Sequence, residues 1–383
     1  MKVLNPTDIG DQNKLSILQI IKENDGISRQ EISKRLKLSA PAVSKNIAAL
    51  LETGIIREAG IDSTSMGRKP IQLKYNASIM YVIGIEMMPQ EIRGGIADLY
   101  GNIVARENKP LILEKGVKAV LEQLEEVLNK LIEKKAEGSR LAEIAIGVPA
   151  LTGQEDLNDL FITYIPEWKD VDLKRYVEEK YHVKTEVMND VELALLGECA
   201  EGEGQVSDNI LFIKYGEGFA ARAIIDGNLL KGYNMAAGEI GYYLEDISKL
   251  TGDFVCPGRM ERELCKEAVK QEKYGGYSGI EYLQKCSEEG DGASKSLLTE
   301  IIGRIAVIIT NTVLVLNPEI VILGGIASKF SDNTIGRIES VLQRTCPFVP
   351  RIVVSKLGID APVIGGIKVA LEGAEKQLVT YWK

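Results

Sequence analysis

The sequence lacks the features that would direct a chain into or across a membrane. Its 383 residues contain no apolar run of the roughly 18 residues that a membrane-spanning helix needs, and the start, MKVLNPTDIGDQNKL, has no apolar signal core. The five cysteines are scattered and odd in number, which favours reduced thiols over a disulfide framework (Cys199, Cys256, Cys265, Cys286 and Cys346). We therefore expect a cytoplasmic protein.

Histidine is almost absent from the chain. The only one, His182, lies in EEKYHVKTE between an expected helix and an expected strand, where it is most simply a surface residue. Apolar residues at 45% and charged residues at 26% are ordinary for a globular protein. Because 383 residues exceed what one hydrophobic core accommodates, we expect two or three folding units.

The net charge of -9 is divided unevenly along the chain. Residues 1–76 carry twelve Lys and Arg against eight Asp and Glu, a balance of +4, which leaves -13 for the remaining 307 residues. A basic N-terminal part on an acidic body suggests that only the first part contacts phosphate. An imbalance of this size could also arise by chance, so charge alone does not decide the function.

The first 76 residues show the order of a helix-turn-helix. Apolar spacing predicts a first helix over residues 12–23. The second begins with a capping box of Ser28 and Glu31, which Ile27 and Ile32 extend as a hydrophobic staple, and it ends near residue 36. Ser39 caps a third helix, in which residues 43, 47, 50 and 51 face the core and a small, polar, singly basic face points outward.

A predicted β-hairpin follows these helices. Strands at 55–58 and 71–75 flank the polar tip DSTSMGRKP, which is typical of a wing that contacts DNA backbone or minor groove. A small helical protein-interaction module is the alternative for these 76 residues. The residues predicted to bind DNA are Ser39, Ala40, Pro41, Ala42, Ser44, Lys45 and Asn46 in the third helix, with Arg68 and Lys69 in the wing.

From residue 80 the pattern changes to strands alternating with helices. YVIGIEM, IRGGIADL and NIVAREN predict three successive strands, followed by a long amphipathic helix from residue 117 and the buried strand AEIAIGVP. A second set begins with NILFIKY and includes a helix near 294–316 before the strand EIVILGG. This recurrence resembles the duplicated, ribonuclease H-like fold of actin and hexokinase. We expect an α/β chain with a winged helix-turn-helix (1–76) and a two-lobed body (77–383), with lobe one at 77–190 plus 362–383 and lobe two at 191–361.

Several motifs carry a family resemblance. GRKP, DLYGNIV, AIGVPA, EWKDVDL, MNDVELALLGE, KYGEGFAARAIIDGNLLKG, AAGEIGY and NPEIVILGG occur in the order found in the ROK family (repressor, open reading frame, kinase). The chain looks most like the repressor branch, which includes xylose and N-acetylglucosamine repressors. The resemblance covers nearly the whole chain and implies a DNA-binding regulator controlled by a sugar-like ligand.

The phosphate loops depart from the pattern of the family's kinases. Where the resemblance implies a Gly-Gly-Thr turn that cradles ATP, the chain reads Met87-Met88-Pro89-Gln90, and Pro89 has no N–H to donate. In the second loop Glu217 adds a carboxylate where phosphate chemistry favours positive charge. We therefore expect no kinase activity and no cofactor.

The family's zinc site also departs from its pattern. Tyr242 stands where the resemblance implies a histidine, and the cysteine cluster is reduced to Cys256, with Cys265 a weak remnant. Because tetrahedral zinc needs four ligands, usually Cys or His, we expect no metal.

The sugar pocket that the resemblance implies is partly kept. The matching positions are Asn189, Asp190, Glu239 and, with a less certain alignment, Glu263, while Tyr242 replaces the family's histidine and Ile165 replaces an asparagine. Carboxylates suit this role because each accepts hydrogen bonds from several hydroxyls. Without phosphate loops, Asp190 would bind sugar rather than act as a base, and we expect its carboxylate at the mouth of the interlobe cleft. The alternative is that Asp190 and Glu239 only cap helices or bridge the lobes.

Three functions remain open from the sequence. The first is a repressor that binds operator DNA as a homodimer or higher oligomer and responds to a sugar-like effector. The second is a ROK-type sugar kinase with an added helix-turn-helix. The third is a regulator whose body is a ligand-free scaffold for dimerisation or interaction. The residues favour the first.

Overall fold

The N-terminal part of the computed structural model is a winged helix, here called the head. The structure describes residues 6–61, 71–149, 151–152, 160–161, 168, 171–247, 250, 258–268 and 279–380. The head contains α1 (Pro6–Glu23), β1 (Ile27–Ser28), α2 (Arg29–Leu36), α3 (Ala40–Glu52), β2 (Ile56–Ile61) and β3 (Ile71–Tyr75). The three strands form an antiparallel sheet in the order β1-β3-β2.

The predicted helix caps of the head are confirmed. Ser28 accepts from the N–H of Glu31, whose carboxylate accepts from the N–H of Ser28 at 3.0 Å, and Ser39 caps α3. Helix α1 starts at Pro6, six residues before the predicted start, because proline is tolerated in a first helical turn.

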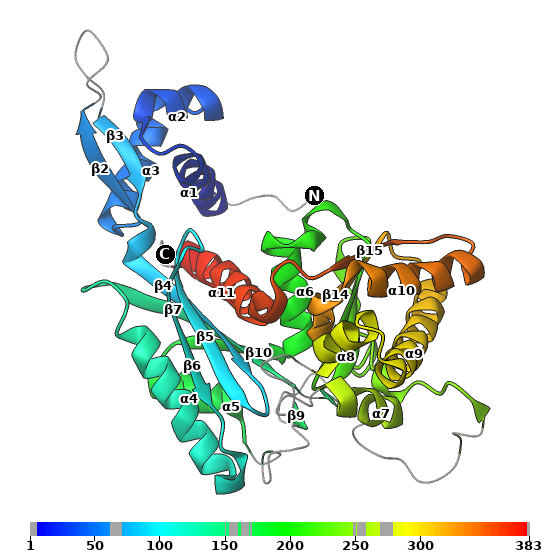
Figure 1. The fold of residues 1–383 in the computed structure, drawn as a ribbon. Coiled ribbons are helices and arrows are strands. Elements are labelled where there is room, and N and C mark those ends of the chain that lie inside the picture. The colour runs from blue at the N-terminus through cyan, green and yellow to red at the C-terminus, as the bar shows by residue number, and fades with distance from the viewer. Residues whose placement is uncertain are drawn as a thin grey trace.

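The first sheet of the body has the strand order β10-β7-β4-β5-β6. β4, β5 and β6 are antiparallel neighbours, whereas β7 and β10 run parallel to β4. Helices α4 and α5 cover one face and α11 covers the other (Figure 1). The bounds are β4 (Met80–Met87), β5 (Glu91–Asp98), β6 (Ile103–Pro110), α4 (Gly116–Ile132), β7 (Arg140–Val148), α5 (Leu173–Tyr181), β10 (Lys184–Asn189) and α11 (Ala361–Thr380), with a short pair β8 (Leu151–Thr152) and β9 (Leu160–Phe161) beside them.

The second sheet repeats this topology in the order β13-β12-β11-β14-β15. Again three strands are antiparallel neighbours and two follow in parallel, as a duplicated fold requires. Helix α6 covers one face, and helices α7 to α10 cover the other. The bounds are α6 (Asp190–Glu201), β11 (Ile210–Tyr215), β12 (Phe219–Ile225), β13 (Asn228–Leu229), α7 (Arg259–Ala268), α8 (Gly279–Glu288), α9 (Gly292–Leu316), β14 (Ile320–Gly325), α10 (Asp332–Thr345) and β15 (Arg351–Val354).

Helices α6 and α11 lie against each other between the two sheets, in backbone contact. A Cβ on Gly365 of α11 would lie 1.8 Å from the carbonyl oxygen of Leu193, and one on Gly197 of α6 would lie 2.2 Å from that of Ala361. Only glycine permits this approach, so the two helices are held as a closely packed pair.

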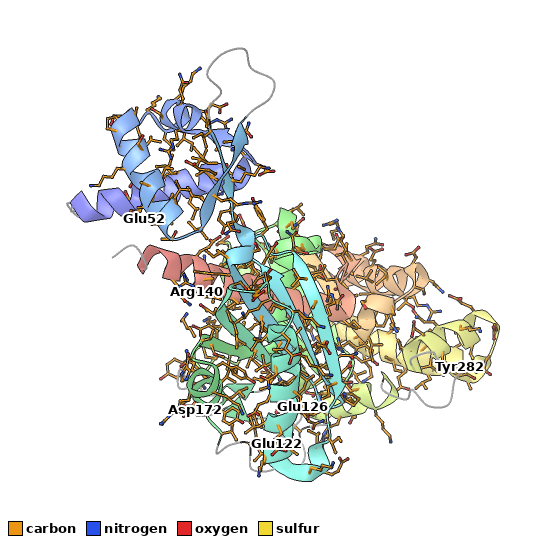
Figure 2. The ribbon with its side chains drawn as sticks, turned by 90° about the vertical axis from the view of Figure 1, so that its left-hand side faces the viewer. Glu52, Glu122, Glu126, Arg140, Asp172 and Tyr282 are labelled. Atoms are coloured by element: carbon orange, nitrogen blue, oxygen red, sulfur yellow. The ribbon has the colours of Figure 1, made fainter. Side chains whose placement is uncertain are left out.

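The head packs directly on the body. One continuous apolar cluster joins the head core to residues of β4, β5 and α11. Tyr75, the last residue of β3, stacks edge-on against Tyr100 with ring centroids 5.1 Å apart, and Lys22 of α1 pairs with Glu375 of α11 at 2.8 Å. Figure 2 shows the head, labelled at Glu52, at one end of the molecule, away from Glu122 and Glu126 of α4.

Helix α9 corrects the expectation that no segment is long and apolar enough to span a bilayer. By length and composition this helix of 25 residues would qualify, but 56% of its apolar window is buried inside the fold. It is apolar on most sides because the second sheet, α8 and α10 surround it.

Candidate functional site

Helix α3 presents most of its predicted DNA-binding residues to solvent. Ser39, Ala40, Pro41, Ser44 and Lys45 are exposed, and Ala42 is half-buried. The N-terminus of α3 therefore offers a small, polar surface with one cation, as a helix entering the major groove requires. Arg68 and Lys69, predicted in the wing, lie outside the described residues.

Asn46 does not belong to this surface, contrary to the prediction. Its side chain is 8% exposed, and its amide donates to the carbonyl oxygen of Ala42 at 2.9 Å. Position 46 is one residue before Ile47 of the apolar stripe, so it turns toward the head core, and the hydrogen bond satisfies the buried amide.

Asn189 caps helix α6 at the junction between β10 and the interlobe region. Its Oδ1 accepts from the N–H groups of Val191 at 3.0 Å and Glu192 at 3.2 Å, and the residue is 6% exposed. Asp190 also accepts from the N–H of Val191, at 2.9 Å through its Oδ1, as the capping alternative for that carboxylate expects.

Asp190 is buried rather than standing at the mouth of the cleft, as was expected. It is 3% exposed and forms an ion pair with Lys214 of β11, whose ammonium also lies 3.8 Å from Glu86 of β4. Burial alone would lower the pKa of Lys214, but the charges of Asp190 and Glu86 raise it above its ordinary value. The cation thus bridges the carboxyl ends of strands from both sheets.

Glu86, at the end of β4, is the second buried carboxylate of this group. Burial raises the pKa of Glu86 to about 7, although Lys214 and Arg93 act to lower it. Arg93 approaches Glu86 at 3.5 Å, a distance too long for a hydrogen bond.

Glu239 pairs with a second buried cation that the sequence reasoning did not identify. Arg222 of β12 donates to Glu239 at 2.9 Å and lies 3.8 Å from Glu192 of α6. Gly238 adopts φ +93°, and a Cβ there would lie 2.1 Å from the carbonyl oxygen of Ala221. The turn at Gly238 therefore brings Glu239 to Arg222.

On helix α7, Glu261 rather than Glu263 faces the other carboxylates. Glu263 is turned outward and pairs with Arg304 at 2.6 Å. Burial raises the pKa of Glu261 to about 7, with further contributions from Glu239 and Asp190. The preceding residue, Met260, is buried in the core of the second sheet, so position 261 lies on the inner side of α7.

We call Asp190, Glu239 and Glu261 the cleft carboxylates. Lys214 and Arg222 neutralise the first two, whereas no side-chain hydrogen bond or ion pair involves Glu261 within the part of the chain that the structure describes. Tyr242 ends the 3-10 turn that follows Glu239, and its N–H donates to the carbonyl oxygen of Glu239 at 3.2 Å. The arrangement offers several acceptors to a ligand that has many hydroxyl groups.

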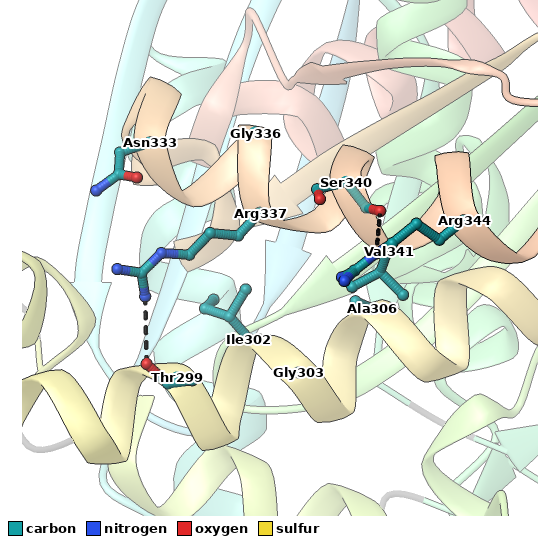
Figure 3. A pocket seen from close by; sticks show the side chains of 10 residues that line it. All are labelled: Thr299, Ile302, Gly303, Ala306, Asn333, Gly336, Arg337, Ser340, Val341 and Arg344. Carbon is teal, nitrogen blue, oxygen red and sulfur yellow. Dashed lines mark hydrogen bonds between the residues drawn. The ribbon is translucent and has the colours of Figure 1, made fainter.

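A separate groove of about 520 Å³ lies between α9 and α10 (Figure 3). Arg337 donates to Thr299 across it at 3.4 Å, and Arg344 donates to the carbonyl oxygen of Ser340 at 2.9 Å. None of the predicted ligand residues lines this groove, so it is no part of the cleft site.

Each of the two parts of the chain matches a known protein family. The sequence matches the ROK family over residues 82–372 and a winged helix-turn-helix DNA-binding family over residues 10–57. It is 26% identical to the xylose repressor of Caldicellulosiruptor bescii over 96% of this chain and 97% of that one. It is 22% identical to the transcriptional dual regulator NagC of Escherichia coli over 86% of this chain and 84% of that one.

A solved structure shares the fold from end to end. The crystal structure of a ROK family transcriptional regulator, a homologue of the Escherichia coli Mlc protein, superposes with a TM-score of 0.71 at 18% identity and covers 98% of both chains. That coverage includes the head as well as both lobes. The chain therefore belongs to the ROK family and carries a winged helix-turn-helix before the family domain.

Proposed function

We propose that this protein represses transcription by binding operator DNA through α3 and the wing, and that a sugar in the interlobe cleft controls its affinity for DNA. The observation that carries the proposal is the convergence of the cleft carboxylates from three different elements beside the start of α6. Convergent carboxylates suit a polyol because each oxygen accepts from a hydroxyl.

The class of effector is inferred from relatives. Of the relatives compared above, one is named as a xylose repressor and another as a transcriptional dual regulator. A free sugar suits the site better than an anion, because Asp190, Glu239 and Glu261 together outnumber the two buried cations next to them.

A continuous chain of packed elements leads from the cleft to the head. Asp190 begins α6, which packs on α11 through Gly197 and Gly365. Helix α11 in turn contacts α1 through the Glu375–Lys22 pair and the shared apolar cluster. A ligand that favours one position of α6 would therefore bias the position of the head, and with it the spacing of two heads in a homodimer.

Kinase activity is the second candidate, and the arrangement around Glu86 argues against it. Residues 88–90 connect β4 and β5 directly, with Pro89 offering no N–H. Lys214 is engaged by Asp190, and Glu217 adds a carboxylate in the loop after β11. A coupled assay for ATP consumption over a panel of sugars should show no turnover above background.

The ligand-free scaffold is the third candidate, and thermal shift separates it from the first. A sugar that binds the folded state raises the melting temperature, whereas a scaffold shows no response to any sugar. Light scattering at micromolar concentration should show a dimer or higher oligomer, since two heads are needed to span two half-sites. A protein with these properties works in the cytoplasm.

The decisive experiment compares two glutamates on one helix. DNA selected from random duplexes by the protein serves as operator, and release is measured with D-xylose, D-glucose and N-acetylglucosamine. We expect Glu261→Gln to weaken the response to the active sugar about tenfold or more, and Glu263→Gln, on the outer face, to leave it within about twofold. Equal effects of both substitutions, or no response of the unmodified protein to any sugar, would contradict the proposal.

A further inference from the structure

A buried arginine lies between the cleft carboxylate Glu239 and the start of helix α6. Arg222 of β12 is 2% exposed and stands opposite Phe212 of β11 in the second sheet. Because side chains alternate between the two faces of a strand, Arg222 points to the face that α6 covers, as Phe212 does. Its neighbours Ala221 and Ala223 point to the other face, toward α9. Arg222 is therefore placed between the proposed effector site and α6.

Three hydrogen bonds hold the guanidinium of Arg222 to the second lobe. Its Nη1 donates to the carbonyl oxygens of Ala221 at 2.7 Å and Ala237 at 3.0 Å, and its Nη2 donates to Glu239 at 2.9 Å. The N–H of Ala221 donates to the carbonyl oxygen of Gly238 at 2.8 Å, which ties the same loop to β12. Arg222 thus forms one unit with the loop that carries Glu239.

The remaining nitrogen of the guanidinium, Nε, approaches helix α6. It is buried, has no hydrogen-bond partner within the described part of the chain, and lies 3.8 Å from the carboxylate of Glu192. A hydrogen bond between nitrogen and oxygen is about 2.9 Å long, so the gap is about 1 Å too wide. Buried donors in folded proteins are nearly always satisfied, and this donor has an acceptor within a short movement.

Closing this gap would move the start of α6. Glu192 is 5% exposed and lies in the first turn of the helix, which Asn189 caps. Burial raises the pKa of Glu192, whereas the charge of Arg222 acts to lower it, so the carboxylate gains from a closer cation. Because Arg222 is held to the sheet by its other bonds, the helix moves toward Arg222, by an amount usual for helix shifts of about 1–2 Å.

We propose that an effector hydroxyl bound to Glu239 draws the start of α6 onto Arg222, and that Arg222 thereby transmits the presence of the effector to α6 through Glu192. The hydroxyl shares the carboxylate of Glu239 with Arg222, which leaves more of the guanidinium charge to attract Glu192. The hydrogen bond between Nε and Glu192 then forms in the bound state. Arg222 is a positioning residue, since it acts through its two carboxylates.

This contact supplies the first step of the path from the cleft to the head. Helix α6 packs on α11, and α11 contacts the head through Glu375 and Lys22. A shift of α6 toward Arg222 is therefore how the effector of the proposed function, on which the proposal rests, would regulate DNA binding.

The experiment compares two substitutions of Glu192, a residue outside the cleft carboxylates. DNA selected from random duplexes serves as operator, the probes are D-xylose, D-glucose and N-acetylglucosamine, and the ratio of the operator Kd values with and without saturating sugar is the coupling factor. Glu192→Gln keeps an acceptor for Nε and should retain at least about half of that factor. Glu192→Leu, of similar volume, removes the acceptor and should bring the factor to within about twofold of one.

Further measurements separate transmission from sugar binding and from folding. The Kd of the active sugar, measured by calorimetry without DNA, should change less than about fivefold in both Glu192 variants, and the melting temperature checks the fold. Arg222→Lys keeps the charge but has neither Nε nor the planar fork, so it should also lose the coupling. In protein containing isotope-labelled arginine, the Nε signal of Arg222, assigned through Arg222→Lys, should move when the active sugar is added.

Three results would overturn this inference alone. The coupling factor could persist in Glu192→Leu, the Gln and Leu variants could lose it equally, or the Nε signal could stay unmoved in the unmodified protein at saturating sugar. The last measurement decides even if a substitution prevents folding. A protein that responds to no sugar at all would instead overturn the proposed function together with this inference.

Discussion

The ion pair between Asp190 and Lys214 joins the two lobes, and a double-mutant cycle measures its contribution to stability. The side chains of Asp190 and Lys214 are 4% and 15% exposed, and Glu86, a second carboxylate paired with the ammonium, lies 3.8 Å away. Lys214→Met removes the charge with little change in volume but leaves Asp190 buried without a cation. Because breaking a buried pair leaves an uncompensated charge, we expect a loss of about 3–5 kcal/mol in the free energy of unfolding.

Asp190→Asn should cost less, about 1–3 kcal/mol, because Lys214 keeps Glu86 as a partner. In the double variant no unpaired charge remains at these two positions, so its loss should fall short of the sum of the single losses by about 2 kcal/mol. Urea unfolding followed by tryptophan fluorescence gives the free energy of unfolding of the unmodified protein, the two single variants and the double variant. Trp168, 1% exposed in the core of lobe one, reports on the sheet that carries Glu86.

An exposed pair provides the control for this cycle. Arg175 and Glu179 lie 2.7 Å apart on α5, with side chains 72% and 65% exposed, and a cycle on them should give a coupling close to zero, because solvent screens exposed charges. A coupling between Asp190 and Lys214 no larger than this control would refute the reasoning, since it would mean that solvent screens the interlobe pair.

The remaining predictions concern packing, DNA binding and pH. Gly365→Ala should lower stability by about 3 kcal/mol because its Cβ would meet a backbone oxygen of α6, while Gly303→Ala, with no atom within 4 Å, should raise it by about 0.5–1 kcal/mol; chemical denaturation measures both. Ser44→Ala should relax sequence preference at one base position by about 1–3 kcal/mol in binding assays with single-base operator variants. Asn46→Ala should instead lower stability by about 1 kcal/mol and change binding to specific and random DNA equally. Burial and the neighbouring carboxylates raise the pKa of Glu261 to about 7, so the stability that its protonated form contributes is present at acid pH and is lost as the pH rises through that value. Glu261→Gln should therefore raise the melting temperature more at pH 8 than at pH 5. An equal rise at both pH values would count against this reasoning.

Local signals predicted the elements of this protein well because those signals act within a few residues. The capping box at Ser28 and Glu31 and the cap at Ser39 both appear in the structure as hydrogen bonds between near neighbours. The repeated strand pattern likewise predicted two sheets of the same topology.

Contacts across the fold were harder to predict. Lys214 and Arg222 interrupt apolar strands, which marks them as unusual, but nothing local says that one meets Asp190 and the other Glu239. The choice between Glu261 and Glu263 depends on which face of α7 is buried, and that follows from packing against the second sheet.

The proposed function requires that sugar binding at the cleft carboxylates and DNA binding at α3 are coupled through the fold. The most direct measurement determines the Kd of the active sugar for the free protein and for the operator-bound protein, together with the operator Kd with and without that sugar. Linkage requires the ratio of the two sugar Kd values and the ratio of the two operator Kd values to be the same factor, typically about 5–150. Glu261→Gln should bring both ratios close to one. An operator Kd that stays unchanged at saturating sugar would show that the two sites are not coupled.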